Sequence, residues 1–182
     1  NTTLTLNSLT INKTDGMVLT IIGGDTVAIG GTLTLTDGYV NTGTLALNTA
    51  NLTGSATFDG GSATILLNDS QAVSLSNGWV LPSLNIDTAT VTIANSASIT
   101  FANAGLTVGV GGTLTQGTGT TVSFTGTGDR TIDVNASQTL VNLTINKAAD
   151  GNIITIAAGD ALVLTGTLTL TNGQVNTGTL QA

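Results

Sequence analysis

The sequence has no cysteine, no histidine and no glutamate, and these absences remove most of the side chains that enzymes use for chemistry. No thiol or imidazole is available as a nucleophile, general base or metal ligand, and every carboxylate belongs to an aspartate. Proline occurs once, and aromatic residues make up 3% of the 182 positions. The composition therefore excludes a disulfide scaffold and predicts a chain that is not an enzyme and has no catalytic residue, cofactor or metal.

Charge is also scarce, at 7% of residues, and the formal net charge is −7. The only cations are Lys13, Arg130 and Lys147, so no basic patch can neutralise phosphates, and we expect no nucleic-acid partner. Thr, Gly or Asn interrupts every apolar run well before the ~18 residues that a spanning helix needs. We therefore expect no insertion into a membrane.

What the chain does contain is aliphatic residues in alternation with threonine. Hydrophobic residues make up 40% of the sequence, and this fraction is too high for a disordered chain. Apolar residues recur with a period of two, and Gly, Asn and Asp separate the pieces, as expected for short strands with one face inward. Typical pairs are Leu4/Leu6, Leu9/Ile11, Leu19/Ile21, Val27/Ile29, Leu33/Leu35, Leu84/Ile86, Val122/Phe124, Ile154/Ile156 and Leu168/Leu170.

A long internal repeat relates residues 9–45 to residues 143–180. LTINK opens both copies, and GTLTLT‑x‑G‑x‑VNTGTL closes both. Aligned residues lie 134 positions apart at the start and 135 apart after one added residue in a turn. Short strands within a long repeat predict coils that stack, in an all-β solenoid covering residues 1–182 as a single unit.

Strand pieces of three to five residues suit a chain that turns a corner after each piece. We expect about 22 residues per coil, about six coils per repeat and about eight coils in all. Neither end offers a cap, because residues 1–12 already read as strand and residues 175–180 still follow the repeat. We expect uncapped ends, covered by further coils of a longer chain or by other copies. A tandem β-sandwich is the structural alternative.

The passages LTINKTDGMVLTI and GGDTVAIGGTLTLTDGYVNTGTL, with their second copies, resemble the strand repeats of large secreted bacterial surface proteins. The resemblance extends to adhesins of the filamentous haemagglutinin kind and to autotransporter passengers. It implies a right-handed parallel β-helix that projects from a cell as a stalk, adhesin or filament. The chain carries no recognisable secretion domain or sorting signal.

Aspartates next to glycine are predicted to lie in turns rather than to bind calcium, because the nonapeptide spacing of calcium β-rolls is absent. These residues are Asp15, Asp25, Asp37, Asp59, Asp150 and Asp160. The one dense charge cluster is TGDRTID, with Asp129, Arg130 and Asp133. Paired carboxylates could serve a polysaccharide-cleaving β-helix, but a surface ion pair of Arg130 with either aspartate is favoured.

Three threonine triplets resemble the ranks of ice-binding solenoids, but their irregular spacing favours ordinary β-propensity on a solvated face. Lys13 and Lys147 occupy equivalent places, where an exposed lysine would discourage sideways pairing of sheet edges. Trp79, Pro82 and Met17 are interpreted as local packing residues, and the N‑x‑[S/T] triplets at Asn51 and Asn142 reflect the abundance of threonine. The triplets are Thr32/Thr34/Thr36, Thr88/Thr90/Thr92 and Thr167/Thr169/Thr171.

These features together predict a structural module or subunit of an extracellular bacterial fibre, located at the cell surface and non-catalytic. Its partner would be itself, end to end or as coils of one long chain. An adhesin stalk that binds surface glycans through Trp79 or Tyr39 is the alternative, and a polysaccharide-degrading enzyme that depends on Asp133 is a further one.

Overall fold

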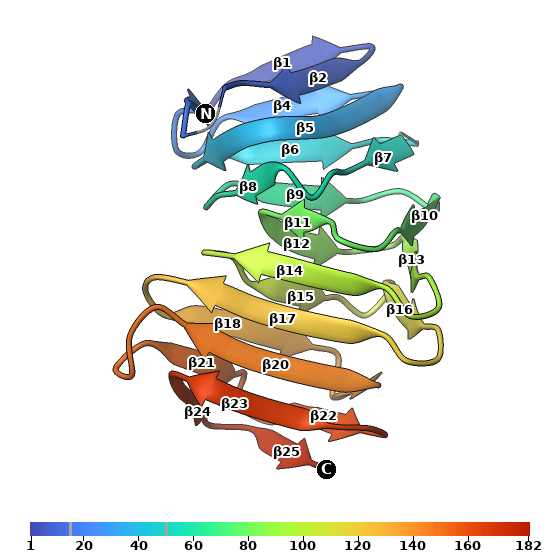
Figure 1. Cartoon of the computed structure of the whole chain (residues 1–182). Helices are drawn as coiled ribbons and strands as arrows, with labels where there is room; N and C mark the ends of the chain where they lie inside the picture. The colour runs from blue at the N-terminus through green and yellow to red at the C-terminus, as the bar shows by residue number, and fades with distance from the viewer. Residues whose placement is uncertain (15, 50) are drawn as a thin grey trace.

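The computed structural model, which describes residues 1–14, 16–49 and 51–182, is a parallel β-solenoid. The strands stack like rungs from the N-terminus at one end to the C-terminus at the other (Figure 1). Each full coil contributes one strand to each of three columns, which we call columns 1, 2 and 3. Eight successive pairings join the nine strands of column 1, so the predicted eight coils are confirmed.

Column 1 is one continuous sheet, and every pairing in it is parallel. Its register gives coil lengths from 18 residues, between Val27 and Leu45, to 26 residues, between Leu106 and Ile132. The expected 22 residues per coil lies in the middle of this range. Its strands are β1 (Thr3–Leu6), β4 (Thr26–Ile29), β6 (Thr44–Leu47), β9 (Thr64–Leu67), β12 (Ser83–Ile86), β15 (Leu106–Val108), β18 (Arg130–Val134), β21 (Ile153–Ile156) and β24 (Gln174–Asn176).

The hydrogen-bonded ladders of columns 2 and 3 are interrupted between some coils. One strand, β5 (Thr32–Asn41), turns the corner from column 2 to column 3, so its first half pairs with β2 and its second half with β3. Column 2 also contains β2 (Leu9–Asn12), β7 (Asn51–Thr53), β10 (Ala72–Leu75), β13 (Thr90–Ile93), β16 (Thr113–Gln116), β19 (Ser137–Leu140), β22 (Ala161–Leu164) and β25 (Thr179–Gln181). Column 3 also contains β3 (Val18–Thr20), β8 (Phe58–Gly60), β11 (Val80–Leu81), β14 (Ser98–Ala102), β17 (Thr121–Gly126), β20 (Asn142–Lys147) and β23 (Leu168–Asn172).

The core is the interior of the coils, where aliphatic side chains from successive strands lie directly above one another. In column 1, Leu45 pairs with Ile65, and Ile65 pairs with Leu84. Phe101 and Phe124 stack with ring centroids 5.2 Å apart. The period-two pattern therefore predicts the interior correctly, because inward residues alternate with threonines that face solvent.

The repeated VNTGTL passage makes one particular corner. Thr42 and Gly43 both have positive φ, of 52° and 64°, and Thr177 and Gly178 repeat this with 50° and 60°. A Cβ on Gly43 would lie 2.3 Å from the Ile21 Cγ2 atom. Glycine is required here, since the backbone conformation and the close approach both exclude a larger residue.

The two copies of the repeat do not occupy the same columns. The first LTIN is β2 in column 2, whereas the second is part of β20 in column 3. Between them the chain makes six coils and advances by one further strand. The second copy is thus shifted by one column relative to the first, so the same sequence forms strands on a different side of the solenoid.

Candidate assembly interface

The N-terminal end of the solenoid exposes apolar side chains around β1, β2 and β3. Leu4 is 57% exposed, Val18 44% and Ile22 72%, although the core residues deeper in the solenoid are almost fully covered. An apolar hollow of about 300 Å³ opens beside these residues. It is lined mainly by Leu4, Leu6, Leu9, Leu19, Ile21 and Val27.

At the C-terminal end, the internal repeat provides a comparison within one molecule. Leu170 in β23 is 57% exposed, whereas its equivalent Leu35 in β5 is fully buried, because β5 is followed by β7 and β8. The other inward residues of the last coil behave alike. Leu168, Val175 and Leu180 are only partly buried, and their equivalents Leu33, Val40 and Leu45 are fully buried.

The N-terminal copy shows the reciprocal difference. Leu9 and Leu19 are partly buried, whereas their equivalents Leu143 and Ile154 have at most 1% of their surface exposed. In the second copy, β17 and β18 pair with β20 and β21 and cover these residues. Each end therefore presents side chains that, at equivalent positions inside the chain, are covered by another coil.

Polar side chains at the corners hold one coil to the next. Asn142 Oδ1 accepts a hydrogen bond from the Thr167 backbone N–H at 2.8 Å, and at the equivalent place Ser8 Oγ accepts from Thr32 at 3.1 Å. Asn95 Oδ1 accepts in the same way from the Thr118 N–H at 3.1 Å. These contacts satisfy backbone groups at corners, where the strand ladder is interrupted.

One such contact changes at the C-terminal end. Asn41 Oδ1 accepts a hydrogen bond from the Ser62 N–H of the next coil at 3.4 Å. Its equivalent Asn176 instead accepts from the adjacent Thr177 N–H at 2.9 Å. At this end of the described chain, a side chain that elsewhere bonds to the following coil bonds to its own corner.

Lys147 is the one strongly buried cation among the described residues, at 1% exposure, whereas its equivalent Lys13 is exposed. The Lys147 Nζ donates a hydrogen bond to the Thr125 carbonyl at 2.8 Å. Burial lowers the pKa of Lys147, the positive charge of Arg130 lowers that pKa further, and Asp129 opposes both effects. The interpretation of an exposed lysine therefore fits Lys13 and is wrong for Lys147, which lies beneath a coil.

The aspartates next to glycine divide into two groups. Asp150 lies in a turn, and Asp25 and Asp160 directly follow turns, where their carboxylates accept the Thr2 and Val134 N–H groups at 2.7 Å. The turn prediction is wrong for Asp37 and Asp59, which lie within β5 and β8, because there the Asp-Gly pair makes an open bend within a strand, with Gly38 and Gly60 at positive φ of 92° and 84°. Asp15 lies outside the described residues. No three acidic side chains in the described part of the chain are close enough to hold a metal ion.

The TGDRTID cluster joins one coil to the next. Asp129 precedes β18, and its Oδ1 accepts the Ile153 N–H of the next coil at 2.8 Å, while Asp133 is exposed on β18. Arg130 donates to the carbonyl oxygens of Asn103 and Asp129, both at 2.6 Å. The expected ion pair is thus replaced by bonds to the backbone. Asp129 and Asp133 also line different surface grooves.

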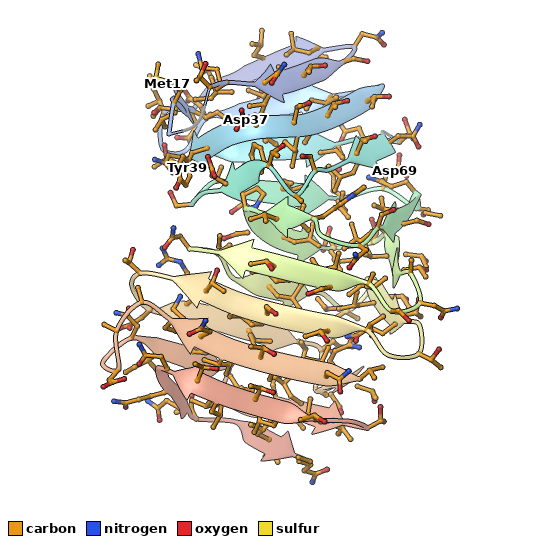
Figure 2. The ribbon with its side chains drawn as sticks, in the orientation of Figure 1. Met17, Asp37, Tyr39 and Asp69 are labelled. Carbon is orange, nitrogen blue, oxygen red and sulfur yellow. The ribbon has the colours of Figure 1, made fainter. Side chains whose placement is uncertain are left out.

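The remaining candidates fall at separate places. Trp79 is a core residue at 8% exposure, which confirms that it is a packing residue and means that it is not available to bind a surface glycan. Met17, in contrast, is 53% exposed at the N-terminal end. Met17 and Tyr39 lie along the same side of the solenoid (Figure 2). Tyr39 borders a shallow groove together with Asn41, Ser62, Asn103 and Arg130. The three threonine triplets lie on or beside β5, β13 and β23, which are not neighbouring strands.

Comparison of the chain with protein-family models, with curated proteins and with solved structures gives no match. Across the described residues there is no helix of sufficient length and apolarity to span a bilayer.

Proposed function

We propose that this chain is a structural, non-catalytic module of an extracellular bacterial fibre, in which coils stack end to end. The coils beyond each end would belong to further copies of the chain or to one longer polypeptide. Mechanical load along the fibre would be carried by the ladder of parallel backbone hydrogen bonds, which surrounds an aliphatic interior.

The observation that supports this proposal most directly is the difference in burial between equivalent residues. Leu35 is fully buried under the next coil, and Leu170, with the same neighbours in sequence, is 57% exposed at the C-terminal end. An exposed strand edge above an apolar interior is a surface to which another strand readily adds. The extracellular location is supported by the polar Thr-rich exterior and by the resemblance to secreted surface proteins.

Electron microscopy of the purified 182-residue chain over a range of concentrations tests the proposal. We expect filaments that lengthen with concentration, and fibre diffraction with a reflection at about 4.8 Å along the fibre axis, the spacing of stacked strands. A matched Leu170→Asp variant, which places a charge on one end, should remain as single particles. Discrete monomers of the unmodified chain at high concentration would contradict the proposal.

An adhesin stalk is the second candidate, and the groove beside Tyr39 favours it. This groove of about 380 Å³ combines an aromatic ring with amide, hydroxyl and guanidinium groups, which are the groups that bind sugars. Glycan-array binding by the unmodified chain that is lost in Tyr39→Ala would support this function. Trp79→Ala is no longer an informative variant, since that side chain is in the core.

A polysaccharide-degrading activity has the least support. Asp129 already accepts a backbone hydrogen bond from the next coil, and Asp133 borders another groove. Turnover of a polysaccharide that disappears in Asp133→Asn would restore this alternative.

A further inference from the structure

The ends of a three-column solenoid are steps rather than flat surfaces. The chain rises by one strand spacing per coil, so consecutive strands lie at successively greater heights along the axis. The last three strands are β23 in column 3, β24 in column 1 and β25 in column 2. Along this path, the strand position that follows β25 lies in column 3, directly beyond β23.

The first three strands begin in a different column. They are β1 in column 1, β2 in column 2 and β3 in column 3. If a second copy were added with its columns aligned to the first, β1 would lie on β24 and β2 on β25. The position beyond β23 would then stay empty, and β3 would face β23 across a missing strand with its backbone groups unpaired.

We propose that copies of this chain join with a rotation of one column, about a third of a turn, around the solenoid axis. This inference rests on the proposed function and specifies its partner and geometry. In the joint, β1 of the second copy pairs with β23 of the first, β2 pairs with β24, and β3 pairs with β25. All three positions are filled and the path of strands continues without a gap.

The side chains at the two ends suit this arrangement. In β23, Leu168 and Leu170 are the inward residues, and in β1 they are Leu4 and Leu6. Parallel pairing places leucine on leucine at both positions, with the threonine between them outward on each strand. Both ends of this contact are exposed in the free chain, since Leu4 and Leu170 are each 57% accessible.

The internal repeat shows that one sequence can occupy two different columns, although its shift runs in the opposite sense to the shift in the joint, where β2 passes from column 2 to column 1. The first copy of LTIN lies in column 2, and the second lies in column 3, six coils and one strand later. Ile11 in the first copy and Ile145 in the second are both buried, at 2% and 0% exposure. The same sequence therefore packs in either column.

Three double-cysteine variants distinguish the possible joints. Thr5 is an exposed, outward residue of β1. In the rotated joint it lies beside Thr169, in the aligned joint beside Asn176, and in the third possible rotation beside Gln181. Neighbouring parallel strands are ~4.8 Å apart, within the Cα separations of disulfides. The chain has no native cysteine, and β1 lies at the opposite end of the solenoid from all three partners, so each disulfide must join two copies (Figure 1).

Each variant would be oxidised under conditions that produce filaments and analysed on gels with and without reductant. We expect a ladder of covalent multimers from T5C/T169C, and loss of that ladder when Leu170→Asp is added. We expect no ladder from T5C/N176C or T5C/Q181C.

A ladder from T5C/N176C or T5C/Q181C instead would overturn the proposed rotation while leaving end-to-end assembly intact. Filaments without a ladder from T5C/T169C would also overturn it, because another joint must then form. Neither filaments nor a ladder would contradict both the rotation and the proposed function.

Discussion

Shortening one leucine in each copy of the repeat should separate folding from assembly. Leu35→Ala is expected to destabilise the folded chain, whereas Leu170→Ala is expected to weaken assembly with a small effect on folding. The two residues occupy equivalent sequence positions and differ in whether a further coil covers them. Their comparison therefore controls for residue type, strand and local sequence.

The expected magnitudes follow from burial. Leu35 is fully buried, and a Leu→Ala change in a core costs about 2–5 kcal/mol of the free energy of unfolding. Leu170 has less than half of its surface covered, so its loss should cost about 1 kcal/mol. Covering the exposed remainder in a joint contributes a further amount of about 1–1.5 kcal/mol. The critical concentration for assembly should then rise about tenfold in Leu170→Ala.

Urea denaturation at a concentration below assembly measures the first quantity, and sedimentation across a concentration series measures the second. Val110→Ala is the matched control, because Val110 is an apolar residue that is 86% exposed in the turn between β15 and β16, away from both ends. It should change neither measurement. An unchanged critical concentration in Leu170→Ala would refute the assignment of the ends as assembly surfaces, and an equal loss of stability in both leucine variants would refute the difference in burial.

Two further predictions concern stability. Gly61 has φ +125°, and a Cβ there would lie 2.0 Å from the Val40 carbonyl oxygen. Gly61→Ala should therefore lower the free energy of unfolding, measured by urea denaturation, by about 3 kcal/mol or more, whereas Gly30→Ala, with open space around the glycine, should change it by less than about 0.5 kcal/mol. Burial lowers the pKa of Lys147 below its ordinary 10.5, so between the two values the unfolded chain binds more protons and stability should increase as pH rises towards 10.5. This increase should be absent in Lys147→Met and retained in Lys13→Met when both are denatured with urea across that range; the same increase in Lys147→Met would assign it to another group.

The alternation of threonine with aliphatic residues was sufficient to predict short strands, an aliphatic interior and the approximate coil length. This pattern records which side chains face inward, a property that each strand carries locally. It was not sufficient for the corners. Asp37 and Asp59 precede glycine as turn residues do, yet both lie in strands, because an Asp-Gly pair specifies a permissive backbone and does not distinguish a tight turn from an open bend.

The corner asparagines were missed for a related reason. Asn142 and Asn95 resemble ordinary turn formers in the sequence, but their side-chain oxygens accept N–H groups 25 and 23 residues further along. These sequence separations are close to the length of one coil. An asparagine that lies about one coil length before a second corner in the sequence is therefore the pattern that could have identified them. The sequence also predicts the same exposed position for Lys13 and Lys147. In the structure the preceding coil covers Lys147 and leaves Lys13 exposed.

The shift between the two copies indicates which property of the sequence the repeat preserves. A surface patch that bound a ligand on one side of the fibre would require its residues to return to the same column, but equivalent residues here lie in different columns. What both copies keep is the inward leucines and isoleucines, the Thr-Gly corner with positive φ and the irregular pairing after Ile11 and Ile145. All of these act between one coil and the next. The repeat therefore preserves the contacts through which coils stack, in whichever column they fall, and this is the property that the proposed joint between copies uses.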